Sequence, residues 1–494
     1  MAASPPSPEA AARQRLAFAL LLAAQLALAL IGASHKSLVQ DELHTRFHAS
    51  AASLPELFAN LRLDNHPPLG FLLVRAGRNL LGDSELALRA PLILCGLLGT
   101  LLVARLCARV GASALLGAAA WALGSTQLEF STQSRMYGLS ALCCIGALDA
   151  LARLAGDGPA RPRDRAELAL WVAAGLLTHY YWLLYSAALA AALLGAAALG
   201  ARGRTLLARS WPSGVAAGVL CLPWYLSTFR QQVTSALPPG MVRAGPHDLV
   251  AAWPHLFAWN VRVGGAVLRI VFIAGAVLAV ALAALGLWKA WRGGRRELAL
   301  VVAALGFAVA PAAGLAAAQW GRMGFNWNYV LPSLPALVVA FAWGAAGEPT
   351  LRRAGVLAVA LGAVLSTLNA FAPASEGHRA AVRWVFEHWR EGDVLYVAER
   401  QGQVFEQGLA WDYYAPRTAQ EFPPPHPVPR RATRWFDVED ASELAGHTRV
   451  LLQAKVANEM AITAHLRELY PREERTTFGY GVEVWVFRPE QPAD

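Results

Sequence analysis

A cluster of acidic residues and a histidine follows the first apolar run of the chain. Asp41 and Glu42 are adjacent, and Asp64 and His66 lie further along the same polar segment, just before two prolines. Carboxylates gain nothing from contact with lipid, so their gathering between apolar runs indicates chemistry. A carboxylate placed there can take a proton from a hydroxyl group. We therefore expect Asp41 to be a catalytic base, with Glu42 as a second catalytic candidate that has a local structural role as its alternative.

Three more polar clusters lie between apolar runs: EFSTQSRMY at 129–137, THYYW at 178–182 and QWGRMGFNWNY at 319–329. A sugar linked to a lipid phosphate would lie with its tail among the helices and its phosphate at the membrane interface. Cations and N–H donors at such a place would stabilise the negative charge that develops on the phosphate when the sugar leaves. We expect Arg135 to lie one turn into a helix that begins near Ser131, where free N–H groups also face an anion. The candidates for binding a phosphate and its sugar are Asp64, His66, Arg135, Tyr137, His179, Tyr180, Arg322 and Tyr329.

These residues have simpler interpretations too. Aromatic and arginine side chains are common at membrane interfaces, where they act as anchors. The prolines after His66 suit the first turn of a helix. The residues Asp41, Glu42 and Asp64 offer the oxygen ligands that a divalent cation prefers, so a bound divalent cation is retained as an alternative. No other cofactor and no defined metal site is predicted.

The composition indicates which elements must position these residues. The chain has 494 residues, of which 56% are hydrophobic and only 16% charged, against about 25% charged in soluble proteins. Apolar runs recur that are long enough to cross a bilayer as helices. The formal net charge of +9 comes from arginines in short loops, which membrane topology explains without a nucleic-acid partner. The five cysteines lie in or at the ends of apolar runs without zinc-type spacing, as small buried residues do.

Eleven membrane spans are predicted, with a short interfacial helix at 67–81 and another at Leu54–Leu63. This arrangement keeps the Arg-rich loops on the inner side and places the polar clusters and the C-terminal part outside. The composition, rich in Ala, Leu and Arg, is typical of a GC-rich bacterial genome, so we expect the cell inner membrane. The predicted spans are 15–34, 86–106, 112–129, 136–155, 166–178, 180–200, 212–229, 264–288, 298–319, 329–346 and 353–372.

The chain is predicted to divide into two domains. Residues 1–374 form the transmembrane domain, in which 35–85 is an external loop with juxtamembrane helices. From residue 375 to 494 the charge rises, and short β-like runs appear at Val394–Ala398, Val450–Gln453 and Val482–Phe487, with a helix at His378–Arg390. The fold class is therefore mainly α, a polytopic helical membrane protein with a small C-terminal α/β domain outside the cytoplasm.

The motifs, in this order and spacing, resemble the C-type membrane glycosyltransferases of family 39, which include protein O-mannosyltransferase-like and aminoarabinose-transferase-like enzymes. The resemblance spans about residues 15–345 and rests on DELHT, DNHPPLGFLLV, STQSRMYGLSAL, HYYWLL and NYVLPSLPAL. It implies a multi-helix membrane fold and a polyprenyl-phosphate sugar donor used on the non-cytoplasmic side. The family's catalytic acid matches Asp41, with Glu42 completing the pair.

The resemblance extends to two further motifs and has two departures. The family's HPP segment matches His66–Pro68, and its Arg-x-Tyr turn matches Arg135 and Tyr137. Gln133 stands where many bacterial members have glutamate, which leaves Glu129 as the nearby acid. Asn328-Tyr329 stands where the family has Arg-Tyr, so an anion-binding role there passes to Arg322 or is absent.

The resemblance implies a transferase that moves a sugar from a polyprenyl phosphate to a protein, lipid or glycan acceptor, and no residue identifies the sugar or the acceptor. A transporter or flippase of a lipid-linked sugar is the alternative. It requires polar residues near the bilayer midplane, whereas the predicted spans are mostly Ala, Leu, Val and Gly, with Asp149 and Arg269 as exceptions near span ends. A non-catalytic scaffold, whose outer domain binds a partner, is a third hypothesis.

Overall fold

The structure is a computed structural model that describes residues 7–62, 64–229, 231–232, 246–258, 260–261, 265–320, 327–373, 376–399, 407–423, 428, 430–434, 448–455, 461–479 and 482–490. The chain forms two compact units. The transmembrane unit comprises Met1–Ala33 and Ala51–Ala372, and the C-terminal unit comprises Ser34–Ser50 and Pro373–Asp494. Residues 35–50, which belong to the predicted external loop at 35–85, therefore group with the C-terminal residues.

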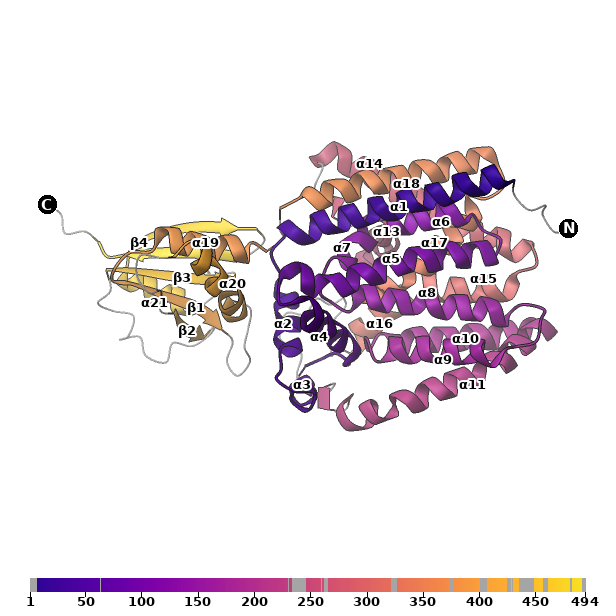
Figure 1. Cartoon of the computed structure of the whole chain (residues 1–494), viewed down its shortest axis with the longest axis horizontal. Helices are drawn as coiled ribbons and strands as arrows, with labels where there is room; N and C mark the ends of the chain where they lie inside the picture. The colour runs from indigo at the N-terminus through magenta and orange to yellow at the C-terminus, as the bar shows by residue number, and fades with distance from the viewer. Residues whose placement is uncertain are drawn as a thin grey trace. The chain divides into compact units, whose positions relative to one another are not determined.

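The transmembrane unit is a bundle of helices, many of which run alongside one another (Figure 1). Its first half contains α1 (Pro8–His35), α3 (Leu54–Leu61), α4 (Leu69–Leu81), α5 (Glu85–Arg109), α6 (Ala114–Ala122), α7 (Ser125–Ser131), α8 (Tyr137–Leu154) and α9 (Pro162–Leu176). Its second half contains α10 (Trp182–Leu199), α11 (Ala201–Trp224), η1 (Tyr225–Phe229), α13 (Pro246–Phe257), α14 (Gly265–Arg292), α15 (Arg296–Ala303), η3 (Ala304–Ala308), α16 (Val309–Trp320), η4 (Trp327–Ser333), α17 (Leu334–Gly344) and α18 (Pro349–Phe371).

Seven helical stretches in the described part are long and apolar enough to cross a bilayer. They are Pro8–His35, Glu85–Arg109, Tyr137–Leu154, Trp182–Leu199, Gly265–Arg292, Arg296–Leu315 and Pro349–Phe371. The other four predicted spans are shorter, broken or more polar: 112–129 divides into α6 and α7, 166–178 lies in α9, 212–229 lies in the arginine-bearing α11 and η1, and 329–346 comprises η4 and α17. The predicted class of polytopic membrane protein is confirmed, and the count of eleven spans stays a prediction.

The two short helices predicted near the start of the chain are present as α3 and α4. Helix α4 has 13 residues, about 20 Å at 1.5 Å per residue, which is too short for a bilayer core of about 30 Å. Gly82, with φ of 93°, follows its last residue and takes a left-handed conformation that glycine adopts without strain. These features agree with the interpretation of α4 as an interfacial helix.

Helix α8 lies at the centre of the bundle, since almost every residue from Tyr137 to Leu154 is buried. Small residues allow the helices to approach one another closely, as is usual in membranes. At the crossing of α14 and α17, a Cβ on Gly286 would lie 1.8 Å from the carbonyl oxygen of Ala340. At one end of α8, the buried carboxylate of Asp149 pairs with Arg105 at 2.6 Å and Arg109 at 3.2 Å and also contacts Arg153. Asp149 is thus neutralised within this network.

The C-terminal unit contains a five-stranded sheet in the order β2-β1-β3-β5-β4. Strand β1 pairs in parallel with β2 and with the central strand β3, whereas β5 is antiparallel to both β3 and β4. Its elements are α2 (Gln40–Ala49), α19 (His378–His388), β1 (Asp393–Glu399), α20 (Gln407–Glu421), β2 (Arg430–Arg434), β3 (Arg449–Lys455), α21 (Ala461–Leu469), β4 (Arg472–Phe478) and β5 (Val482–Arg488).

The three predicted β-runs are confirmed as parts of β1, β3 and β5, and the predicted helix is α19. Apolar residues of these strands, including Leu452 and Phe487, form the core of the unit with Ile462 and Leu466 of α21. Strand β4 was not predicted because its sequence, REERTTF, is polar and largely exposed. It lies at the edge of the sheet, where charged side chains discourage pairing with other chains.

Candidate functional site

The loop between α3 and α4 is organised by Asp64. Its Oδ1 accepts hydrogen bonds from the backbone N–H groups of Asn65 at 2.6 Å and His66 at 2.9 Å. The same oxygen lies 3.0 Å from Nδ1 of His66. Because an ionised carboxylate only accepts, we assign a proton to Nδ1 of this histidine. Both side chains are more than nine-tenths buried, so Asp64 fixes the orientation of the His66 ring.

Tyr180 holds this loop through a third residue. Its hydroxyl donates to Oε1 of Gln232 and accepts from Nε1 of Trp224 at 3.1 Å. The amide nitrogen of Gln232 in turn donates to the carbonyl oxygens of Leu61 and His66. Burial raises the pKa of Tyr180 above its usual value, so it remains a neutral phenol. Tyr180 therefore lies behind the loop and supports it.

Two further contacts join this loop to other predicted clusters. The backbone N–H of Leu69 donates to the carbonyl oxygen of Leu177 at 2.9 Å, directly before the THYYW segment. At Gly70, an added Cβ would lie 2.7 Å from Cβ of Met136. Glycine at this position thus permits α4 to approach the turn that contains Arg135.

His179 is the best-defined donor of the site. Its Nδ1 accepts the backbone N–H of Tyr181 at 3.1 Å, so the proton of the neutral ring is on Nε2. Only 5% of the residue is exposed, and Nε2 has no hydrogen-bond partner among the residues that the structure describes. Burial, followed by the charges of His66 and Arg135, holds the pKa of His179 well below its usual value. The side chain is therefore a neutral, buried N–H donor.

Aromatic rings surround His179. The ring of Tyr329, from η4, lies 4.8 Å from the imidazole between centroids, that of Tyr181 lies at 5.4 Å and that of Tyr137, the first residue of α8, at 6.2 Å. The ring of His66 packs edge-on against His179 at 5.3 Å. Helix α10 fixes η4, because the hydroxyl of Tyr185 donates to the carbonyl oxygen of Val330 at 3.0 Å. Phenol and imidazole groups supply the hydrogen-bonding atoms that a sugar or a phosphate requires.

Arg135 joins the cluster from a position that differs from the prediction. We expected it one turn into a helix that begins near Ser131, but α7 ends at Ser131 and α8 begins at Tyr137. Arg135 lies in the bend between them and is 5% exposed. Its Cζ is 5.8 Å from the centroid of the Tyr137 ring. The bend therefore brings a buried cation to the start of α8.

The two candidate catalytic carboxylates lie on α2, in the C-terminal unit. Asp41 is exposed, whereas Glu42 is fully buried. Oε2 of Glu42 accepts the backbone N–H of Val39 at 3.0 Å, which caps the start of the helix. This contact gives Glu42 a local structural role, the alternative kept open by the sequence. Asp41 is the carboxylate that remains on the surface of the helix.

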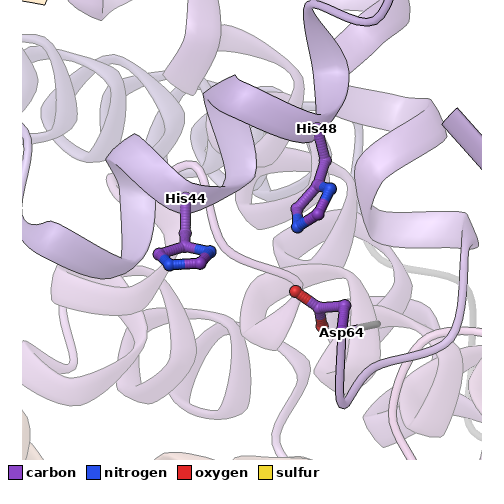
Figure 2. Close-up of side chains that lie close together, drawn as sticks. All are labelled: His44, His48 and Asp64. Atoms are coloured by element: carbon purple, nitrogen blue, oxygen red, sulfur yellow. The ribbon is translucent and has the colours of Figure 1, made fainter. Parts of the chain in front are cut away.

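Two histidines on α2 were not predicted as site residues. His44 and His48 lie one turn apart on the same side of the helix (Figure 2), with ring centroids 6.0 Å apart. Their four-residue spacing was the signal in the sequence, and imidazoles at this spacing are frequent metal ligands. A divalent cation, which the sequence left as an alternative, would therefore find nitrogen as well as oxygen ligands on α2.

The structure brings together most of the predicted binding residues. Asp64, His66, Arg135, Tyr137, His179 and Tyr329 meet at one end of the bundle through the contacts given above. Tyr180 supports them from behind, and Arg322 lies outside the described residues. Sequence reasoning missed the supporting role of Gln232, since an isolated glutamine carries no pattern.

The part of the chain that carries His66, Arg135, Tyr137 and His179 of this cluster matches a known family. Residues 65–226 match the family model described as dolichyl-phosphate-mannose-protein mannosyltransferase. The crystal structure of ArnT from Cupriavidus metallidurans in the apo state matches with a TM-score of 0.62 at 14% identity, over 96% of this chain and 98% of that chain. The chain has the fold of the C-type membrane glycosyltransferases. The resemblance inferred from the sequence motifs is thereby confirmed.

Two other solved structures show the same fold. ArnT from Cupriavidus metallidurans bound to undecaprenyl phosphate matches with a TM-score of 0.54 at 15% identity, over 95% of this chain and 97% of that chain. The cryo-EM structure of the arabinofuranosyltransferase AftD from Mycobacteria matches with a TM-score of 0.52 at 13% identity, over 96% of this chain and 40% of that chain. No curated protein sequence matches the chain significantly.

Proposed function

We propose that this protein is an inverting glycosyltransferase of family 39 in a bacterial inner membrane, which transfers a sugar from a polyprenyl phosphate to an acceptor outside the cytoplasm. The observation that carries the proposal is the buried N–H donor of His179, surrounded by Tyr137 and Tyr329, with the Arg135 cation stacked near Tyr137. The shared fold with ArnT bound to undecaprenyl phosphate supports a lipid phosphate as the anion. The acceptor is a protein, lipid or glycan.

The reaction follows from the charges involved. The acceptor hydroxyl attacks the anomeric carbon while its proton passes to the carboxylate of Asp41. The bond between that carbon and the phosphate oxygen breaks, and the polyprenyl phosphate leaves with the electron pair. Its charge changes from about −1 to −2, so no acid is needed, and Arg135 and the N–H group of His179 stabilise the added charge.

The other site residues have supporting roles in this proposal. Asp64 orients His66, whose ring packs on His179, and Tyr180 holds the loop through Gln232. Glu42 caps the helix that carries Asp41. Arg322 is kept as a second cation for the phosphate. A divalent cation, if bound on α2, would add positive charge near Asp41.

The test is a transfer assay in proteoliposomes. Undecaprenyl phosphates carrying radiolabelled mannose, glucose or 4-aminoarabinose are supplied together with membranes from a strain that lacks the gene, as the source of acceptor. We expect wild-type protein to transfer one of these sugars and Asp41→Asn to lose at least about 99% of the rate. The control is Glu387→Gln, which removes an exposed carboxylate paired with Arg383 and leaves the rate unchanged.

Two results would contradict the proposal. An Asp41→Asn protein that transfers sugar at the wild-type rate would remove the proposed base. Movement of the labelled lipid across the bilayer without cleavage of the glycosidic bond would instead identify a transporter. Glycans and lipid A from the deletion strain, compared with those of its parent, identify the acceptor.

A further inference from the structure

The helix that carries the proposed base is built into the C-terminal unit. Residues Ser34–Ser50, which include α2, group with Pro373–Asp494, although the chain on both sides of this segment belongs to the transmembrane unit. By covalent connection α2 is an insertion in the transmembrane unit. By its packing it is an element of the C-terminal unit. The contacts that hold the start and the far end of α2 are made with residues of the C-terminal unit.

Glu376 binds the start of α2. Its Oε2 accepts the backbone N–H of Gln40 at 2.8 Å, and its carbonyl oxygen accepts the hydroxyl of Ser37. The first N–H groups of a helix have no partner within the helix, and a negative charge there is favourable. Glu376 is itself held in place, because its backbone bridges to Gly479 and its carboxylate lies 2.9 Å from Nε2 of the fully buried His378.

Two tyrosines of α20 bind the two ends of this segment. The hydroxyl of Tyr414 accepts the backbone N–H of Leu38 at 2.6 Å, two residues before α2 begins. Near the other end of the helix, Cζ of Arg46 lies 4.8 Å from the ring centroid of Tyr413. Both tyrosines are almost fully buried, so α20 offers rigid partners. These contacts thus hold the helix at its start and near its far end.

These contacts determine which way Asp41 faces. Gln40, the residue bound by Glu376, precedes Asp41 directly, and the buried Glu42 follows it. With the helix held in this rotation, Glu42 lies inside and Asp41 stays on the surface. A rotation of α2 by part of a turn would exchange their environments. The direction of the proposed base therefore depends on residues more than 300 positions away in the sequence.

We propose that Glu376 and Tyr414 are positioning residues for Asp41, so that the C-terminal unit is part of the catalytic machinery. The inference rests on the proposed function, in which Asp41 is the base. It differs from a role in which the C-terminal unit only recruits the acceptor. A positioning role lowers kcat, because a base displaced by about 1 Å costs about 100-fold in rate. A recruiting role changes the KM of the acceptor.

The experiment compares full-length variants in the proteoliposome assay, with undecaprenyl phosphate carrying the labelled sugar that the wild-type protein transfers. Glu376→Ala removes the carboxylate, Glu376→Gln keeps an oxygen acceptor for Gln40, and Tyr414→Phe removes the acceptor for Leu38. Glu387→Gln is the matched control, because it removes a carboxylate of the same unit that pairs with Arg383 of its own helix, α19. Hydrogen exchange of the peptide 38–42 reports on α2, and that of β3 reports on the fold of the unit.

Glu376→Ala is expected to speed exchange at 38–42, to leave β3 protected and to lower kcat about 10- to 100-fold, with the KM of the lipid donor unchanged. Glu376→Gln should recover part of the loss, and Tyr414→Phe should show the same pattern more weakly. If β3 loses protection in Glu376→Ala, that substitution has disturbed the fold of the unit. The kcat values of Glu376→Gln and Tyr414→Phe, compared with wild type, then decide whether the two residues position Asp41.

The inference is overturned if α2 is loosened while kcat is unchanged, if α2 is not loosened, or if only the KM of the acceptor changes. A fully active Asp41→Asn protein would instead refute the proposed function, and this result is distinguishable because it does not involve Glu376.

Discussion

The role of His179 can be tested with a pair of substitutions that separate its two nitrogens. The Nδ1 atom accepts the backbone N–H of Tyr181, and the Nε2 atom is the donor proposed to face the phosphate. Asparagine places a polar group near the position of Nδ1 but does not reach that of Nε2. Glutamine places an amide N–H near Nε2 but leaves the backbone of Tyr181 without its acceptor. The two variants therefore remove different halves of the imidazole.

The size of the effect follows from the hydrogen bond that is lost. A hydrogen bond to a charged group contributes about 1.5 to 3 kcal/mol, which corresponds to about 10- to 100-fold. We expect His179→Asn to lower kcat/KM for the lipid donor by that factor, and His179→Gln to lower it less. The measurement is the initial rate against donor concentration, with the exposed His465→Gln as the control. If the asparagine variant equals or exceeds the glutamine variant, Nε2 is not the phosphate donor.

The same residue gives the protein a pH dependence of stability. The pKa of His179 is lowered below its ordinary value of 6.5 in the folded protein, so below pH 6.5 the unfolded chain binds a proton that the folded chain does not. Stability is then lost as the pH falls below about 6.5, and at higher pH the group has no effect. The unfolding temperature should fall less between pH 7.5 and 5.5 in His179→Asn than in wild type. An equal fall in both would contradict this assignment.

Three other predictions follow from the described contacts. Arg135→Ala should weaken binding of undecaprenyl phosphate about 10- to 100-fold, measured by titration in nanodiscs, and an unchanged Kd would exclude it as a phosphate ligand. Asp149→Asn should lower the free energy of unfolding by about 1 to 3 kcal/mol, because Arg105, Arg109 and Arg153 lose the buried carboxylate that they share but still reach solvent. We expect a lower unfolding temperature with normal transfer kinetics, and an unchanged unfolding temperature would contradict the role of this network. A cysteine at the exposed Glu391 should react with an impermeant maleimide from outside the inner membrane, against a low background because the native cysteines are buried; labelling only from the cytoplasm would invert the topology.

The sequence by itself determined the class of protein and pointed to most residues of the cluster proposed to bind the sugar donor. Apolar length identifies membrane helices because the bilayer core fixes how many residues a helix needs. Buried polar residues between such helices, including His66, Arg135 and His179, are costly unless they serve a purpose, so their residue types were informative without coordinates. The strands β1, β3 and β5 could be predicted equally well, since their apolar runs form the core of the C-terminal unit.

Only the tertiary structure decided how these residues are arranged and held. The tautomer of His179 depends on the backbone of Tyr181, and the support of the His66 loop depends on Gln232, a partner that no local pattern indicates. The packing of α2 on the C-terminal unit depends on Glu376, which is more than 300 residues distant along the chain. Contacts between residues far apart in sequence depend on how the chain folds back on itself, whereas hydropathy and residue type report only on the local environment. The identity of the proposed base was therefore readable in the sequence, and the residues that orient it were not.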